Sequence, residues 1–178
     1  MSSTVPDQRR LLEVIAFQAE VLGAAADPDA TMQLACDRAR VVTGAGGAAI
    51  ELAHADDMVC HVSSGSLASH AGRRLALATG MSGLAVRTGG VQRCDDSERD
   101  ARVDRAACRR AGLRSMLCVP LRHAGITVGV LEVISPRTAA FDDVDVALLT
   151  LLSGVIAGAM TQAELIRRLQ EPRHRLTA

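Results

Sequence analysis

Hydrophobic residues recur along this chain with two different periods, and together these periods predict an α+β fold. Helical spacing holds over two segments near the N-terminus and over one long segment near the C-terminus. Between them lie short runs rich in Val, Leu and Ile, bounded by Gly, Pro and Asp, as is typical of strands and turns. We expect a single domain over 1–178, with N-terminal helices in 7–43, the sheet region in 44–135 and a long helix in 141–170.

The two N-terminal segments read as amphipathic helices. From Asp7 to Leu22 the apolar residues Leu11, Ile15, Ala19 and Leu22 recur at helical spacing. Asp27-Pro28-Asp29 then breaks the chain and caps a second helix, which is expected to end toward Gly44.

The clearest strand signal is a hairpin in the second half of the chain. Ser115–Arg122 and Ile126–Ser135 are both apolar, and His123-Ala124-Gly125 between them supplies a tight turn. Pro120 has no N–H to donate, so we expect it at a bulge or on a side without a ladder partner.

The C-terminal helix carries its own start signal. Asp142 is expected to cap it, and Phe141 to pack onto Val146 one turn later. A helix from there to Glu171-Pro172 would be about 40 Å long, whereas sheet strands span roughly 20 Å, so it should overhang the sheet. The expected stripe along it consists of Val144, Leu148, Leu151, Val155, Ala159, Ile166 and Leu169. We predict a homodimer through the terminal helices, with Gly154, Val155, Gly158 and Ile166 at the contact.

Composition removes several classes of function. The chain has 178 residues, zero formal net charge and no Lys, Trp or Tyr. Schiff-base chemistry therefore has no lysine, base stacking has only Phe17 and Phe141, and no partner nucleic acid is expected. Its five Cys residues, in no CxxC spacing, are interpreted as reduced thiols of a cytoplasmic protein. The longest apolar stretch, Val146–Met160, is too short for a membrane span, so no membrane partner is expected.

Five short motifs follow one another along the chain: Gly44–Leu52, Gly80–Gly90, Leu113–Leu121, Gly125–Val133 and Phe141–Asp145. In this order and spacing they resemble the GAF domain family of sensory modules, whose architecture is similar to that of PAS domains. The resemblance implies a central antiparallel sheet of about six strands. It also implies terminal helices packed on one face, and a ligand pocket with its lid on the other.

Pocket residues follow from strand alternation together with this resemblance. Val130, Glu132 and Ile134 share one face of the last strand, and Met116 and Cys118 on the partner strand should face the same way. Glu132 matches the position from which cyclic-nucleotide-binding GAF domains reach their ligand. The alternative is that Glu132 lies at a solvated sheet edge or pairs with an arginine.

The charged segment Arg93–Arg114 corresponds to the family's variable loop over the pocket. Arg93 and Asp95 from this segment complete the predicted pocket, and we expect a helix from about Asp100. A charge run of this kind is also what an ordinary solvated face carries, so both readings stay open.

Cyclic-nucleotide binding, bilin attachment and sulfoxide reduction by GAF domains each require particular residues, which can be compared with those of this chain. Ser135-Pro136 occupies the place of the Asn-Lys of cyclic-nucleotide sensors, and Cys60-His61 lies on a strand rather than on the helix that bilin pigments use. Free methionine sulfoxide reductases carry Cys-Gly in the glycine-rich turn, where this chain has Ser82-Gly83. Cys94 and Cys108 could still form a redox pair in the lid.

We therefore expect a stand-alone, bacterial, cytoplasmic sensory or regulatory domain that binds a small molecule or acts as a dimeric signalling module. No catalytic residue, metal or cofactor is expected, and a signalling protein is the expected further partner. The alternatives are a thiol-dependent reductase of the free methionine sulfoxide type and a ligandless dimerisation module.

Overall fold

The computed structural model describes the backbone of residues 8–23 and 27–170, and the side chains of 8–21 and 27–162. Its centre is a six-stranded antiparallel sheet with the order β3-β2-β1-β6-β5-β4. The strands are β1 Gly47–His54, β2 Asp57–Gly65, β3 Arg74–Ala76, β4 Gln92–Cys94, β5 Ser115–His123 and β6 Ile126–Ser135. The expected antiparallel α+β architecture is confirmed.

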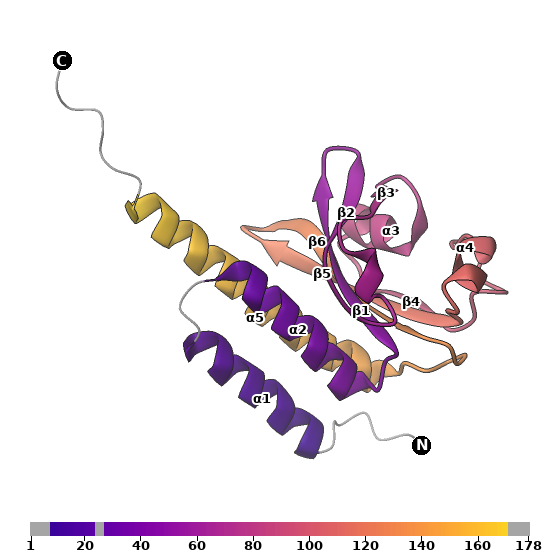
Figure 1. Cartoon of the computed structure of the whole chain (residues 1–178), viewed down its shortest axis with the longest axis horizontal. Helices are drawn as coiled ribbons and strands as arrows, with labels where there is room; N and C mark the ends of the chain where they lie inside the picture. The colour runs from indigo at the N-terminus through magenta and orange to yellow at the C-terminus, as the bar shows by residue number, and fades with distance from the viewer. Residues whose placement is uncertain (1–7, 24–26, 171–178) are drawn as a thin grey trace.

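Helices cover the two faces of the sheet unequally (Figure 1). The long helices α1 Gln8–Gly23, α2 Pro28–Thr43 and α5 Asp143–Gln170 lie together on one face. The other face carries α3 Gly80–Thr88, α4 Arg105–Arg110 and the 3₁₀ turn η1 Ala68–His70.

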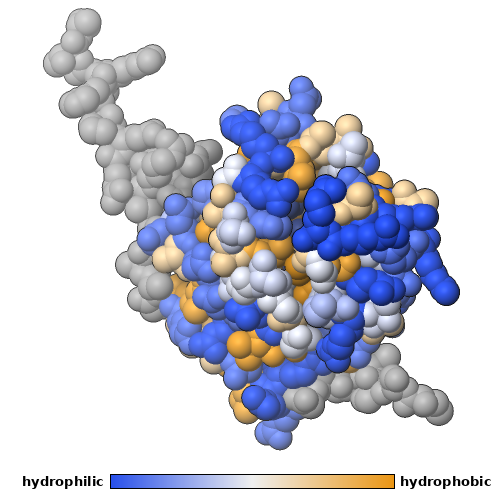
Figure 2. All heavy atoms as spheres, turned by 45° about the vertical axis from the view of Figure 1, so that its right-hand side comes forward, coloured by the Kyte–Doolittle hydropathy of each residue, from blue (hydrophilic) through white to orange (hydrophobic). Residues whose placement is uncertain are grey.

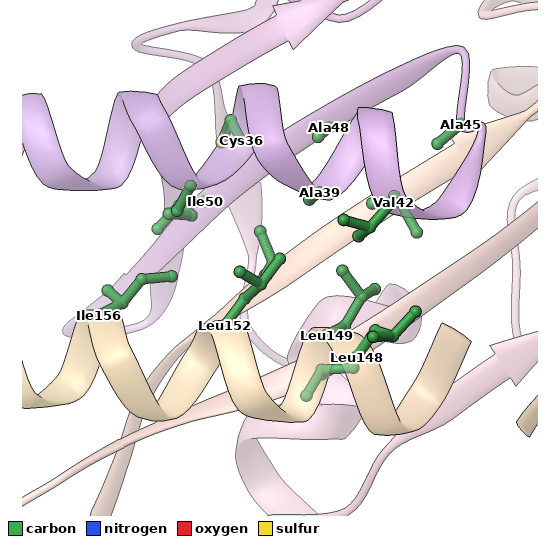
Figure 3. Close-up of a cluster of buried hydrophobic side chains, with 14 of the residues drawn as sticks. Cys36, Ala39, Val42, Ala45, Ala48, Ile50, Leu148, Leu149, Leu152 and Ile156 are labelled. Atoms are coloured by element: carbon green, nitrogen blue, oxygen red, sulfur yellow. The ribbon is translucent and has the colours of Figure 1, made fainter. Parts of the chain in front are cut away.

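Strand alternation divides the interior into two clusters of buried residues. Leu117 and Val119 of β5, with Leu131 and Val133 of β6, point toward the long helices. Figure 3 shows the contact, in which Ile50 of β1 lies among side chains of α2 and α5. Residues of opposite parity, Met116, Cys118, Val130 and Ile134, form the second cluster on the other face, as their alternation predicts.

Helix α1 buries a different stripe from the one predicted. Val14, Phe17 and Val21 are buried in the first cluster, whereas Ile15 is 57% exposed and Ala19 is exposed. Burying the Phe17 ring removes more apolar surface from water than burying Ile15 and Ala19 would, so the helix turns that side inward. Leu11 is half-buried, and the side chain of Leu22 lies outside the described residues.

The predicted start and end of helix α2 agree with the structure. Asp27 accepts the backbone N–H groups of Asp29 and Ala30 at 3.0 and 3.3 Å. Gly44 follows the last turn with φ +65°, the left-handed conformation that suits glycine after a helix.

A reciprocal cap fixes the first turn of α5. Asp142 Oδ1 accepts the N–H groups of Val144 and Asp145 at 2.9 and 3.0 Å, and Asp145 Oδ2 accepts the N–H of Asp142 at 2.9 Å. Asp145 also forms an ion pair with Arg10, which joins the start of α5 to α1. The side chain at position 145, 4% exposed, therefore links two helices as well as capping one.

The stripe predicted along α5 is only partly correct. Val144 and Leu148 are buried, but Leu151 is 47% exposed, because the core instead takes Leu149, Leu152 and Ile156. By length and composition Asp143–Gln162 could cross a membrane, with a mean hydropathy of 1.8. In the folded chain its inner side packs against α2 and the sheet, which is also how a core helix behaves.

The hairpin of β5 and β6 has the predicted turn, with φ of 49° at Ala124 and 81° at Gly125. The register shifts between Leu121 and Arg122, immediately after Pro120, so the expected irregularity lies one residue beyond the proline.

The helix in the charged segment is shorter than predicted. It starts at Arg105 rather than near Asp100, because Asp104 accepts the N–H of Ala107 at 3.0 Å and so caps the helix there. The charges nearby pair across the loop rather than along a helix, as in Glu98 with Arg109 and Asp96 with Arg114.

Candidate ligand-binding cavity

A cavity of about 400 Å³ lies between the sheet, helix α3 and the charged segment. Figure 2 shows this side of the molecule, where hydrophobic surface lies in the hollows between hydrophilic ridges. The sheet supplies its floor through β1, β2, β3, β5 and β6. The residues that line it from the sheet are Ala49, Glu51, Met58, Cys60, Leu75, Met116, Glu132 and Ile134.

The other walls come from the segments that cover this face. They are Leu67, His70, Arg73, Thr79, Gly80, Met81, Ser82 and Gly83 on one side, and Arg102, Val103, Asp104, Ala107, Cys108, Ala111 and Leu113 on the other. The apolar members outnumber the charged ones, which is the composition of a small-molecule site of about 300–1,000 Å³.

Helix α3 lies close to the sheet because of its glycines. Gly80 has φ +72°, a left-handed conformation that starts the helix at a sharp turn. A Cβ added at Gly83 would lie 2.2 Å from the carbonyl oxygen of Leu77, so only glycine allows this approach. The approach brings Met81 and Ser82 to the cavity wall, where Ser82 Oγ lies 3.9 Å from Cys118 Sγ.

Two carboxyl groups face the cavity from adjacent strands. In the antiparallel register Glu132 of β6 lies opposite Ala49 of β1, and Glu51 lies opposite Val130. Glu51 and Glu132 are therefore diagonal neighbours on one face, a spacing that long side chains can bridge.

Glu51 is the more deeply buried of the two. It is 6% exposed, and its Oε2 atom has no hydrogen-bond partner. Burial raises the pKa of this carboxyl, while the Ser82 hydroxyl and, to a smaller extent, the Arg73 guanidinium oppose the shift. An unpartnered buried carboxylate oxygen destabilises a fold, so its presence in a cavity points to a group that it would bind.

Glu132 is surrounded by protein but keeps some accessible surface because it faces the cavity. Burial, and after it the negative charge of Glu51, raises the pKa of Glu132 to about 8. Two neighbouring carboxyls cannot easily be ionised at the same time, so the pair holds a proton near neutral pH.

Arginines stand at the rim of the cavity without pairing with these carboxyls. Arg73 Nη1 lies 3.0 Å from His70 Nε2. Arg102 binds Asp100 at 2.6 Å and the carbonyl oxygen of Arg93 at 2.8 Å. Within the described part of the chain, no ion pair involves Glu51 or Glu132.

The thiols near the cavity are held in their neutral form. Burial raises the pKa of Cys60 to about 11 and of Cys94 to about 12, with Glu51 and Asp100 adding to the respective shifts. Burial also raises the pKa of Cys108 and Cys118. The thiolate is the reactive form of cysteine, so these environments favour inert thiols.

Five of the residues predicted for the pocket lie at the cavity or directly behind its floor. Met116, Glu132 and Ile134 line the cavity. Cys118 and Val130 are fully buried in the cluster behind its floor.

Arg93 and Asp95 do not line this cavity, contrary to the sequence-based assignment. Arg93 pairs with Leu117 in the β4–β5 ladder and so has the parity of the helix-covered face. Its guanidinium binds Asp143 at 2.9 Å and Asp95 at 3.4 Å, at the surface.

Glu51 is the functional candidate that sequence reasoning missed. The signal was available, because Glu51 is a single charged residue in the apolar run Ala48–Ala53. Alternation places it on the same face of its strand as Ala49, so that a charged side chain in an apolar strand was the available signal.

The residues predicted for dimer contact lie on α5. Gly154 and Gly158 are exposed and Val155 is half-buried, whereas the side chain of Ile166 lies outside the described residues. Among the described residues, no group of three or more His, Cys, Asp or Glu side chains is arranged to hold a metal ion.

Comparison with known proteins identifies relatives of this fold. A family model described as the GAF domain matches residues 25–161. The free methionine-R-sulfoxide reductase of Neisseria meningitidis, solved with its substrate, superposes with a TM-score of 0.78 at 20% identity, covering 91% of this chain and 96% of that one.

Two further structures are similar to a comparable degree. The GAF domain of a phosphoenolpyruvate-protein phosphotransferase from Coxiella burnetii has a TM-score of 0.79 at 17% identity, with 94% of this chain and 99% of that one covered. The GAF-B domain of DevS from Mycobacterium smegmatis has a TM-score of 0.67 at 24% identity, with 81% and 100% covered. No curated protein matches the chain.

Proposed function

The chain belongs to the GAF domain family, and we propose that it is a sensory or regulatory domain that binds a small molecule in the cavity without catalysing its conversion. The observation that carries the proposal is the unpartnered carboxylate oxygen of Glu51, buried at the floor of a 400 Å³ cavity. A ligandless module would gain stability from an apolar residue there, because a buried charge without a partner costs several kcal/mol.

A reductase of the kind solved from Neisseria meningitidis is the second candidate, because its fold superposes over most of this chain and because Cys108 lines the cavity. Two observations favour binding over catalysis. Ser82 stands where the reductase family has cysteine, and the raised pKa of Cys94 and of Cys108 disfavours the thiolate that would attack a sulfoxide.

The proposed domain acts as a homodimer through α1 and α5. Leu12 and Ile15 on α1 are 56% and 57% exposed, and Leu151 on α5 is 47% exposed. A methyl group added at Gly154 or Gly158 would meet no atom of the described residues within 4 Å, so nothing in the described part of one chain requires glycine there. Each glycine costs the helix about 1 kcal/mol relative to alanine, and close approach of a second helix would account for both.

In this proposal a second copy of the chain is the first partner, and a signalling protein reads the state of the dimer in the cytoplasm. Ligand in the cavity would act on β6, which contributes Glu132 to the cavity floor and Leu131 to the core beneath α5.

Native mass spectrometry of the purified protein tests ligand binding directly. We expect a retained small molecule, or binding after incubation with a metabolite mixture, that Glu51→Gln weakens. Protein that retains nothing and binds nothing from such a mixture would contradict the proposal.

Light scattering tests the dimer. Wild type should have the mass of two chains, and Gly158→Leu or Ile15→Glu should reduce it to one. Leu75→Glu is the matched control, because Leu75 is 49% exposed on the edge strand β3, which pairs with β2 and carries neither of these helices, and the variant should leave the dimer intact. A monomer at high micromolar concentration would refute this part.

A further inference from the structure

We propose that the ligand of the cavity is a small organic cation, a protonated amine on a compact apolar body, whose ammonium group binds between Glu51 and Glu132. This inference rests on the proposed function, since it names the class of molecule that the cavity takes. It goes beyond it because the GAF fold by itself is compatible with ligands of any charge.

The carboxyl pair supplies the charge complement. Glu51 Oε2 has no partner, and Glu132 is the diagonal neighbour of Glu51 on the same face of the sheet. An ammonium group has three donors and no acceptor, so it can bond to both carboxylates at once, while an anion placed there would be repelled. A neutral hydroxyl could satisfy one oxygen but would leave the negative charge buried and uncompensated.

The rest of the wall selects an apolar body. Met58, Met81, Met116, Leu113 and Ile134 line the cavity, and methionines adapt to ligands of irregular shape. No aromatic residue is among the lining residues, so recognition of the cation depends on the carboxylates rather than on cation–π contact.

In the described part of the chain no protein cation forms an ion pair with Glu51 or Glu132, although the Arg73 guanidinium acts on Glu51 from farther away. Arg73 is directed to His70, and Arg102 is bound to Asp100. These arginines stand at the rim, where they disfavour a second positive charge on the ligand. We therefore expect a monoamine to bind better than a diamine of the same length.

Binding should depend on pH, since the ammonium group needs an ionised carboxyl while the empty pair holds a proton near neutrality. The other titratable or charged groups that line the cavity are Arg73 and His70 on one side, Cys60 within the sheet, and Arg102, Asp104 and Cys108 from the charged segment. Burial, and after it the charge of Arg73, lowers the pKa of His70 and so favours its neutral form, and the raised pKa of Cys60, about 11, keeps that thiol neutral. Affinity for the amine should therefore tighten between pH 6 and pH 8, with release of a proton on binding.

Three probes of one shape test the charge: cyclohexylmethylamine, cyclohexylmethanol and cyclohexanecarboxylate. Binding to the full chain is measured by isothermal titration calorimetry and by ligand-dependent thermal shift at pH 6 and pH 8. We expect the amine to bind at least tenfold more tightly than the alcohol at pH 8, and the carboxylate to bind most weakly. Titration in two buffers of different ionisation enthalpy should detect the released proton.

Variants separate the carboxyl pair from the rest of the cavity. Glu51→Gln and Glu132→Gln should each weaken the amine tenfold or more and leave the alcohol unchanged. Arg74→Gln is the matched control: the Arg74 side chain pairs with Asp57 at 3.0 Å and is not among the residues that line the cavity, so amine binding should be unchanged.

Each alternative outcome has a distinct meaning. Equal or tighter binding of the alcohol or the carboxylate, or amine binding that neither Glu51→Gln nor Glu132→Gln weakens, would overturn the cation inference and leave ligand binding in place. Absence of binding by all three probes, together with no retained molecule in native mass spectrometry, would overturn both the inference and the proposed function.

Discussion

The substitution Glu132→Gln should stabilise the protein at alkaline pH and leave it nearly unchanged at pH 5. Burial and the charge of Glu51 raise the pKa of Glu132 from 4.5 to about 8 in the folded protein. A carboxyl whose pKa is higher in the folded than in the unfolded protein makes the fold less stable as pH rises. This loss is absent below the unfolded pKa and grows as pH rises toward the folded pKa. Between these values the unfolded chain is ionised at this position while the folded one holds the proton.

The magnitude follows from the size of the shift. Each pKa unit corresponds to about 1.4 kcal/mol, so ionisation of Glu132 costs the folded state on the order of 5 kcal/mol above pH 8 at most. Water that enters the cavity reduces this cost, and we expect a gain in unfolding free energy of about 2–4 kcal/mol for Glu132→Gln at pH 8. At pH 5 the gain should fall below about 1 kcal/mol, because this pH is only slightly above the unfolded pKa of 4.5 and little of the loss has developed there.

Urea denaturation at pH 5, 6.5 and 8 measures both the gain and its slope. Glu98→Gln is the matched control, because the Arg109 side chain lowers the pKa of Glu98 and the variant should gain no stability as pH rises. A Glu132→Gln protein that is less stable than wild type at pH 8, or that has the same pH dependence, would refute the raised pKa and with it the picture of a carboxyl pair sharing a proton.

Three further predictions test the fold and the absence of catalysis. Phe17→Ala should reduce the free energy of unfolding by about 3–5 kcal/mol, whereas Ile15→Ala should change it by less than about 1, as urea titration of both would show. Gly83→Ala should destabilise, because its Cβ would lie 2.2 Å from the Leu77 oxygen, and Gly154→Ala, which meets no atom within 4 Å, should not destabilise the isolated fold; a Gly83→Ala protein with an unchanged melting temperature would contradict the first. Purified protein with thioredoxin or dithiothreitol should not reduce free methionine sulfoxide, and measurable turnover would promote the reductase candidate.

Much of this fold could be predicted because its signals are local. The Asp27 and Asp142 caps and the Ala124-Gly125 turn depend on neighbours within a few residues, so the sequence contains the whole interaction. The face of α1 could not be predicted in the same way. Leu11, Ile15 and Ala19 form as regular a stripe as the buried one, and only the packing of Phe17 against the other helices decides between them.

The cavity was predictable in part for a similar reason. Strand parity identified the face that carries Met116 and Glu132, since alternation is a property of each strand alone. The partnership of Glu132 with Glu51 depends on the β1–β6 register, which joins segments 81 residues apart in numbering and has no local signal. Arg93 was misplaced because the ladder partner of a three-residue strand cannot be read from so short a pattern.

Strand β6 shows why the two proposals can be tested independently. Leu131 and Val133 of this strand pack in the core beneath the long helices, while Glu132 between them faces the cavity. A change from Glu132 to Gln therefore alters the charge of the cavity and removes no buried methyl group from the helix-covered core. Conversely, Ile15 and Gly158 lie on the exposed side of the helix layer, with the sheet between them and the carboxyl pair. Loss of the dimer with unchanged amine binding would then assign the effect to the helix-covered face of the sheet. Loss of amine binding with an intact dimer would assign it to the cavity face, since effects at separated sites add independently.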